Sequence, residues 1–142
     1  MEQSSDQASP ARLFVLLIGA ALVVGGIAGF FYEADFGTGE RLVADDVLGI
    51  FPTNGWDNLM HLIAGFACLL AASRGPRQMA LAIGGLFTVL AVWGLLVSDG
   101  GVGSLLDVIP VDTGDNLLHL AIGLTGIAAG LAGTRRPPPA VA

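Results

Sequence analysis

The two histidines of this chain are the residues best suited to chemistry, and both stand at the same point of a repeated phrase. His61 lies in DNLMHLIAG and His119 lies in DNLLHLAIG, each four residues after an aspartate. Residues at positions i and i+4 lie on one face of a helix, so each imidazole can contact its own carboxylate. The sequence therefore predicts two pairs, Asp57 with His61 and Asp115 with His119.

Three interpretations of these pairs remain open. In the structural interpretation, which we favour, the aspartates or the asparagines after them cap two helices, and each histidine hydrogen-bonds a carboxylate or a loop carbonyl. In the second, two imidazoles and two carboxylates at one depth bind zinc or another transition metal ion. In the third, the imidazoles are axial ligands of a haem, although the first turn of a helix is shallow for that group. The residues of this candidate cluster are His61, His119, Asp57, Asp115, Asn58 and Asn116.

The elements that must position this cluster are long apolar runs. The chain has 142 residues, 54% hydrophobic and 13% charged, and its mean hydropathy is +0.74. A soluble domain of this size could not bury so much apolar surface, and roughly 20 helical residues cross a hydrocarbon core of about 30 Å. The second run is short and needs its flanking polar residues to cross. We expect spans at residues 13–32, 57–73, 79–97 and 115–133 in a membrane domain at 13–134, with disordered segments at 1–12 and 135–142.

The arginines predict which way the chain faces. Five of the six flank spans on the side of the N-terminus, the middle loop and the C-terminus, which the positive-inside rule makes cytoplasmic. These five are Arg12, Arg74, Arg77, Arg135 and Arg136. The first run could instead be a cleaved signal peptide, but its leader MEQSSDQASP is acidic and the run is long for such a segment. We therefore expect a multi-pass protein of a bacterial cytoplasmic membrane with both termini in the cytoplasm.

The chain carries an internal repeat. Residues 52–65, PTNGWDNLMHLIAG, match residues 110–123, PVDTGDNLLHLAIG, at the displacement of 58 positions that separates His61 from His119. The first and third spans match more faintly at a displacement of 65, as from Gly19 to Gly84. Two halves in the same orientation are related by a pseudo-two-fold axis along the membrane normal. The expected fold class is all-α, a polytopic membrane protein of four transmembrane helices built as two parallel helical-hairpin repeats.

Small residues are expected where the helices meet, because helix association inside lipid depends on close packing. The glycines expected at helix contacts are Gly25, Gly29, Gly65, Gly123, Gly126 and Gly130. The single cysteine, Cys68, excludes an internal disulfide and is expected to pack as a small apolar residue. In the outer loops, RLVADDVLGIF and GSLLDVI have apolar residues at helical spacing before a proline, so we expect surface helices there.

With its repeat, the chain resembles a family of small four-helix membrane proteins found mainly in actinobacteria and known as a domain of unknown function. The resemblance covers about residues 13–135 and rests on FPTNGWDNLMHLIAG, IPVDTGDNLLHLAIG and the arginine-containing turn SRGPRQ. It implies the four-span topology, and it implies no particular activity, cofactor or substrate.

These features together favour a protein without enzymatic activity. No nucleophile stands beside a base as covalent catalysis requires, and the span interiors hold no carboxylate or proline of the kind that marks a transport pathway. We expect a structural or accessory membrane component without a cofactor, whose partners are the lipid bilayer, other membrane subunits or a second copy, and no nucleic acid. The alternative is a metal- or haem-binding membrane protein that uses His61 and His119.

Overall fold

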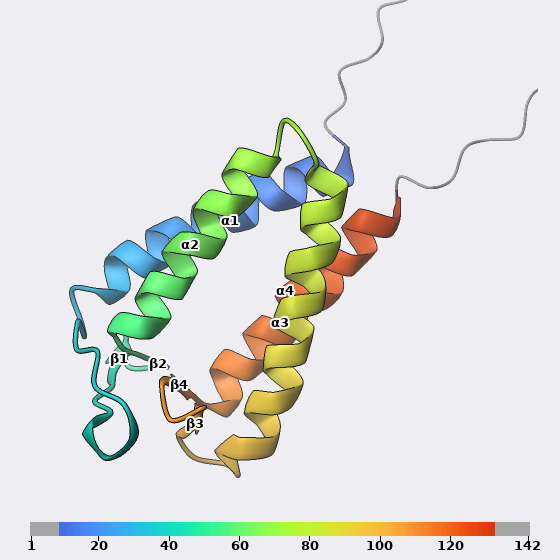
Figure 1. The fold of residues 1–142 in the computed structure, drawn as a ribbon. Helices are drawn as coiled ribbons and strands as arrows, with labels where there is room; N and C mark the ends of the chain where they lie inside the picture. The colour runs from blue at the N-terminus through green and yellow to red at the C-terminus, as the bar shows by residue number, and fades with distance from the viewer. Residues whose placement is uncertain (1–8, 133–142) are drawn as a thin grey trace, which may run out of the picture.

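A computed structural model describes residues 9–132, and most of this part of the chain is helical (Figure 1). Of the segments predicted to be disordered, 1–12 and 135–142, residues 1–8 and 135–142 lie outside the described residues. The prediction was wrong for residues 10–12, which form the start of the first helix. The helices within 9–132 are α1 (Pro10–Gly29), α2 (Gly55–Ala71), α3 (Pro76–Ser98) and α4 (Thr113–Ala132), with a short 3-10 helix, η1, at Gly39–Arg41. The strands in the same part of the chain are β1 (Asp45–Val47), β2 (Phe51–Thr53), β3 (Gly103–Leu105) and β4 (Ile109–Val111).

Local chemistry sets where the long helices begin and end. The side chain of Ser9 accepts a hydrogen bond from the Arg12 backbone N–H at 3.2 Å, and Pro10 follows at the first helical position, where its missing N–H costs nothing. The first helix therefore begins three residues before the predicted span. It ends at Gly29, where the predicted span continued to Tyr32, because the chain turns there and the Tyr32 N–H binds the carbonyl of Gly29.

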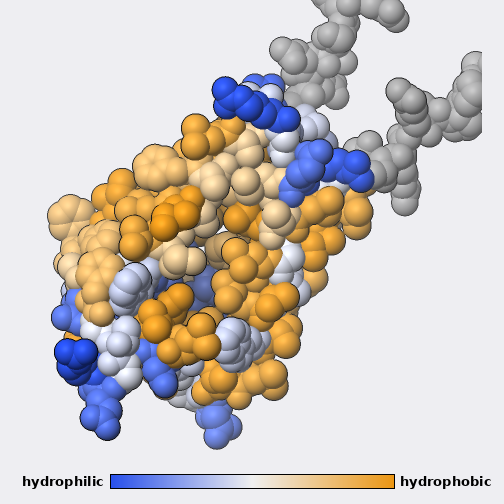
Figure 2. Space-filling model, viewed as in Figure 1, coloured by the Kyte–Doolittle hydropathy of each residue, from blue (hydrophilic) through white to orange (hydrophobic). Residues whose placement is uncertain are grey.

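Helices α1, α3 and α4 are each long and apolar enough to cross a membrane. Helix α2 is apolar but shorter, at 17 residues. The sides of the helices that face away from the protein are covered by apolar side chains, so most of the visible surface is hydrophobic in Figure 2. Such a surface is unstable in water and suits a lipid environment.

The four helices form two helical hairpins (Figure 1). Helix α1 packs along α2 in the first half of the chain, and α3 packs along α4 in the second half. Each hairpin is closed by a β-hairpin, and both β-hairpins lie at the same end of the molecule, which we call the β end. The start of α1, the α2–α3 connection and the end of α4 lie at the opposite end, which we call the turn end.

The prediction of surface helices in the loops at the β end was wrong. Strand β1 pairs with β2, and β3 pairs with β4, both antiparallel, and each strand residue of the first β-hairpin lies 58 positions before its counterpart in the second. The residues between the strands take left-handed backbone angles, with φ of 56° at Leu48 and 55° at Leu106. A helix cannot continue through such a turn, and a proline in each second strand also disfavours it. The fold is therefore mostly helical, with two small β-hairpins.

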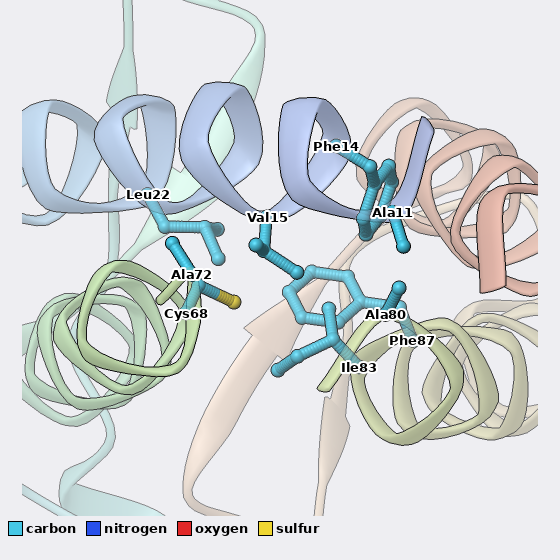
Figure 3. Packing of buried hydrophobic residues seen from close by; sticks show 9 residues of the cluster. All are labelled: Ala11, Phe14, Val15, Leu22, Cys68, Ala72, Ala80, Ile83 and Phe87. Atoms are coloured by element: carbon cyan, nitrogen blue, oxygen red, sulfur yellow. The ribbon is translucent and has the colours of Figure 1, made fainter. Parts of the chain in front are cut away.

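The hydrophobic core lies where α1 crosses α2 and α3, towards the turn end. In Figure 3, Val15 points from α1 into the space between Cys68 of α2 and Phe87 of α3, and all three side chains are buried. The cluster consists of Ala11, Phe14, Val15, Leu22, Cys68, Ala72, Ala80, Ile83 and Phe87. This packing joins the two halves of the chain, whereas the β end is joined by loop contacts.

Candidate functional site

The two histidines meet between the two halves of the chain. Their ring centroids are 6.0 Å apart, and the ring planes are inclined at 67°. In each pair the histidine Nδ1 lies 3.4 Å from the Oδ2 atom of its own aspartate, Asp57 or Asp115. The sequence expectation placed both histidines in the first helical turn, but they lie at the end of the second turn, because both helices begin earlier than expected.

The helix caps differ from the predicted ones. The Oδ1 atom of Asn54 accepts a hydrogen bond from the Asp57 N–H at 2.9 Å, and the Oδ1 atom of Asp112 accepts one from the Asp115 N–H at 2.7 Å. Asn54 and Asp112 are thus the capping residues, and the prediction that Asp57 and Asp115, or the asparagines after them, cap the helices was wrong. Each aspartate of the cluster stands instead at the third helical position, where its carboxylate is left to face the histidine four residues later.

The two asparagines of the cluster pack on bare glycine backbone. A Cβ atom added to Gly29 would overlap the carboxamide of Asn58, and one added to Gly94 would overlap the carboxamide of Asn116. Both asparagine side chains are fully buried. Gly29 and Gly94 are 65 positions apart, the displacement found between the first and third spans. Asn58 and Asn116 are 58 positions apart, the displacement found between the second and fourth. The same close contact therefore occurs in both halves.

The hydrogen bonds around these asparagines differ between the two halves. The Thr53 hydroxyl donates to the Asn58 Oδ1 atom at 2.7 Å and lies 3.0 Å from Asp57 Oδ2, while Asn58 Nδ2 donates to the Glu33 carbonyl at 2.8 Å. In the second half Val111 stands in the place of Thr53. Within residues 9–132, the Oδ1 and Nδ2 atoms of Asn116 and the Nδ1 atom of His119 have no hydrogen-bond partner.

A cavity of about 320 Å³ opens beside the histidines, between the two helical hairpins. Its polar wall comes from α2, α4 and the end of β2, and its apolar wall comes from α1, α3 and α4. The first β-hairpin closes it at the β end. A hollow with hydrophilic atoms at its base is visible between the hairpins in Figure 2. The polar lining consists of Thr53, Asp57, Asn58, His61, Asp115 and His119, and the apolar lining includes Ile18, Leu22, Phe87, Leu118 and Ile122.

The glycines that close the helical hairpins are nearly those expected. A Cβ at Gly65 would come 2.8 Å from the Gly19 carbonyl oxygen, and the equivalent Cβ at Gly123 would come 2.9 Å from the Gly84 carbonyl oxygen. The expectation for Gly25 was wrong, since it is exposed and nothing lies within 4 Å of its added Cβ. The neighbouring glycine at position 26 is buried instead. The glycines of α4 at positions 126 and 130 are also buried against α3.

Two side chains near the site were not found from the sequence. Phe87 meets the His119 ring edge to face at a centroid distance of 4.8 Å, and it stands 65 positions after Leu22, which lines the same cavity. Thr53 is the other, and its position inside the repeated phrase, opposite Val111 in the second copy, was the signal that could have drawn attention to it. The site is therefore chemically asymmetric although the contact of an asparagine with a glycine occurs in both halves.

The candidate site offers more hydrogen-bond acceptors than donors. An imidazole that carries its hydrogen on Nδ1, the atom that faces the carboxylate at 3.4 Å, has a lone pair on Nε2. The cluster therefore presents imidazole nitrogens and carboxylate oxygens. Among the described residues, no three histidine, cysteine, aspartate or glutamate side chains are grouped so as to hold one metal ion. No hydroxyl or thiol in the cavity wall stands as a nucleophile against a histidine, since within 9–132 the Thr53 hydroxyl is bonded to Asn58 and Asp57.

Comparison with known proteins yields one family. A family model described as "Domain of unknown function (DUF4383)" matches residues 12–132, which is most of the chain. The match confirms the resemblance to a family known as a domain of unknown function. No curated protein and no solved structure matches the chain.

Proposed function

The chain belongs to the family of the domain of unknown function DUF4383, and from this premise we propose that it is a four-span membrane protein with a structural or accessory role and no enzymatic activity. The observation that carries the proposal is the apolar outward surface of all four helices. Among the exposed large apolar side chains are Leu17 and Val24 on α1, Phe66 on α2, Leu96 on α3 and Leu124 on α4. A surface of this kind is stable only against lipid or another apolar protein surface.

Helix α2 is the shortest of the four proposed spans. At 1.5 Å per residue its 17 residues extend about 26 Å, slightly less than a typical hydrocarbon core. Its outward positions are nevertheless apolar, namely Met60, Ile63, Phe66 and Leu70. It also packs along α1, which is long enough to cross, and its two ends lie at the β end and the turn end. Both features support a full crossing, with Asn54 and the β-hairpin in the interfacial region.

The parallel arrangement of the two halves is supported by repeated geometry. The β-hairpins have the same register, and the asparagine-on-glycine contact recurs in each half. Two units of this kind that share a β end must each cross the membrane and return. The β end is tied to the helices by Asn58, which bonds Thr53 and the Glu33 carbonyl, and by Asn54, which bonds the Val108 carbonyl. It is the part of the molecule best suited to contact another subunit or a second copy.

The orientation is proposed from the arginines. Arg12, Arg74 and Arg77 all lie at the turn end, which we place in the cytoplasm of a bacterial cell. A reporter domain fused after Arg77 should then be active only as a cytoplasmic reporter. Activity of a periplasmic reporter at this position would reverse the orientation.

A second candidate function is favoured by the distance between the histidine rings. A nitrogen bound to a metal ion at about 2 Å puts its ring centroid about 3 Å from the ion, so two rings can share one ion when their centroids are about 6 Å apart. The observed separation is 6.0 Å. The contact of each Nδ1 with a carboxylate also leaves Nε2 free, as in many metal-binding histidines. A bis-imidazole site for a transition metal or a haem is therefore the alternative.

One preparation separates the two candidates. The protein is purified in mild detergent after growth with added haem and metal salts, and its absorption spectrum and metal content are measured beside those of His61→Gln and His119→Gln. An accessory protein gives no haem band and no stoichiometric metal, and both variants stay folded. A haem band or bound metal that disappears in both variants would replace the accessory role with the cofactor role.

A further inference from the structure

We propose that the cavity between the helical hairpins binds an amphipathic organic cation, whose ammonium group lies among Asp57, Asp115 and the two histidines and whose apolar body lies against Leu22 and Phe87. The proposal goes beyond the accessory role. It relies on the four-span topology only for the route by which a ligand enters.

The polar wall of the cavity lacks a positive charge. It carries two carboxylates and two imidazoles, and no arginine lines it in the described part of the chain. The side chains of Asp57 and Asp115 are only 13% and 12% exposed. Carboxylates removed from water in this way are costly unless a cation or several hydrogen-bond donors accompany them.

The histidines compensate these carboxylates only in part. Their Nδ1 atoms lie 3.4 Å from the carboxylate oxygens, beyond the usual range of a hydrogen bond. Asp57 has the Thr53 hydroxyl in addition, whereas no side-chain hydroxyl within 9–132 reaches Asp115. The Nδ1 atom of His119 is buried without a hydrogen-bond partner among the described residues, in a ring that is 8% exposed. An ammonium group has the donors and the charge that this wall lacks.

The remaining wall is apolar and defines the body of the ligand. Leu22 from α1 and Phe87 from α3 lie at equivalent positions of the repeat, and Ile18 and Ile122 extend the same surface. A volume of about 320 Å³ lies at the lower end of the range for small-molecule pockets, about 300 to 1,000 Å³. This space is much larger than one metal ion requires, and a compact hydrocarbon group fills it.

The entrance faces the apolar surroundings of the bundle. Gly25 of α1 and Leu118 of α4 line the cavity and are both exposed on the outer surface of the helices. A ligand that partitions into the membrane would therefore reach the site sideways between these helices. An anionic amphiphile, such as a fatty acid, would place its carboxylate beside Asp57 and Asp115 and would supply none of the hydrogen-bond donors that this wall lacks.

The test uses three molecules with the same apolar body. Adamantylamine, adamantanol and adamantanecarboxylate carry a cationic, a neutral and an anionic group on one rigid hydrocarbon cage, and their binding to the full chain in nonionic detergent is measured by isothermal titration calorimetry. We expect adamantylamine to bind at least about tenfold more tightly than the alcohol, a difference of about 1.4 kcal/mol, and the carboxylate not to bind. Equal binding of the three, or no binding of the amine, would overturn the proposal.

Two variants locate the site, and a third is their control. Asp115→Asn removes one carboxylate, and Gly25→Leu fills the entrance at a position with open space around it. Each should weaken adamantylamine binding at least about tenfold. Asp99→Asn changes an exposed aspartate outside the cavity and should bind as the parent does. Thermal unfolding of each variant shows that it is folded, and unchanged binding in both cavity variants would contradict the assignment.

Competition with zinc distinguishes this ligand from the metal alternative. Zinc chloride that binds tightly and excludes adamantylamine would overturn the proposal in favour of a bis-imidazole metal site. Failure of the four-span topology would be seen in intact cells and would leave binding in detergent unchanged, so the two ideas fail independently.

Discussion

Each half of the molecule has two helices joined through a β-hairpin, and the halves differ in the hydrogen bonds of their buried asparagines. Asn58 rests on Gly29 with the Thr53 hydroxyl and the Glu33 carbonyl as partners. Asn116 rests on Gly94 in the same way, but within residues 9–132 its carboxamide has no partner. The close glycine contact is thus common to both halves, whereas among the described residues the hydrogen bonds of the carboxamide are present only in the first.

The difference has a structural cause in the helices that precede the asparagines. Helix α1 ends at Gly29 and frees the carbonyl of Glu33, which turns back to Asn58. Helix α3 continues about one turn further, to Ser98, the residue equivalent to Glu33, and the Ser98 carbonyl is used by the N–H of Gly101. The longer helix thus removes the acceptor that Asn116 would need.

The largest effect is expected from filling the two glycine positions. Gly29→Ala and Gly94→Ala each force a methyl group into a buried carboxamide, and overpacking of this kind costs about 1 to 3 kcal/mol. We expect Gly29→Ala to be the more harmful, because it also displaces two hydrogen bonds of Asn58. Unfolding in mixed detergent micelles measures the free energy. Gly25→Ala, with open space at its Cβ, is the control and should be neutral or slightly stabilising, because alanine favours a helix over glycine.

Replacing each asparagine tests whether the two halves differ in stability. Asn58→Leu leaves the Glu33 carbonyl without its partner and the Thr53 hydroxyl with Asp57 alone, so it should lower the free energy of unfolding by about 1 to 3 kcal/mol. Asn116→Leu replaces a carboxamide that is already unpaired among the described residues, so it should be neutral or stabilising. Equal losses in the two variants would show that the halves are energetically alike after all.

A smaller effect is expected from exchanging the residues that precede the caps. Thr53→Val removes the hydroxyl donor of Asn58 and should cost about 1 kcal/mol. Val111→Thr introduces a hydroxyl at the equivalent position beside Asn116, and we expect it to be neutral or to recover part of that energy. The same unfolding assay decides this, and a strongly destabilising Val111→Thr would contradict the equivalence of the two positions.

The smallest effect concerns the caps themselves. Asn54 accepts the Asp57 N–H and also donates through Nδ2 to the Val108 carbonyl of the other half at 2.7 Å, whereas the equivalent residue Asp112 has no amide to donate. Asn54→Ser keeps a capping oxygen and loses the Nδ2 donor without adding a buried charge, so it should cost about 0.5 to 1 kcal/mol. Asp112→Asn keeps its cap and is the matched control, expected to be nearly neutral.

The helices and the buried face of α4 could be predicted because apolar length and a spacing of three and four residues determine them directly. Asn116, His119 and Gly123 lie on that buried face. The β-hairpins could not, because strands of three residues are too short to show alternation and their apolar residues also fit helical spacing. The caps were misplaced by three residues, because Asp57 is as good a capping residue as Asn54 by type alone.

The contact of Asn58 with Gly29 and the cavity depend on the packing of separate segments. Gly29 and Asn58 both belong to the repeat, but nothing in their spacing shows that a helix end meets a side chain 29 positions later. Gly25 was chosen as a packing residue because it stands four residues before Gly29, while the actual contact face passes through Gly26. Small shifts of helix phase of this kind are set by tertiary packing.

The most direct test of the four-span topology is whether the two β-hairpins face the same side of a membrane. Single cysteines are introduced at the equivalent positions Asp46 and Ser104 and at Gln78 near the turn end, in a Cys68→Ala background, and intact cells are treated with a thiol reagent that does not cross membranes. The four-span topology predicts that D46C and S104C are both labelled in intact cells and that Q78C is labelled only after the cells are opened. Labelling of only one of the two β-hairpin positions in intact cells would mean that α2 does not cross, and it would contradict the parallel four-span repeat.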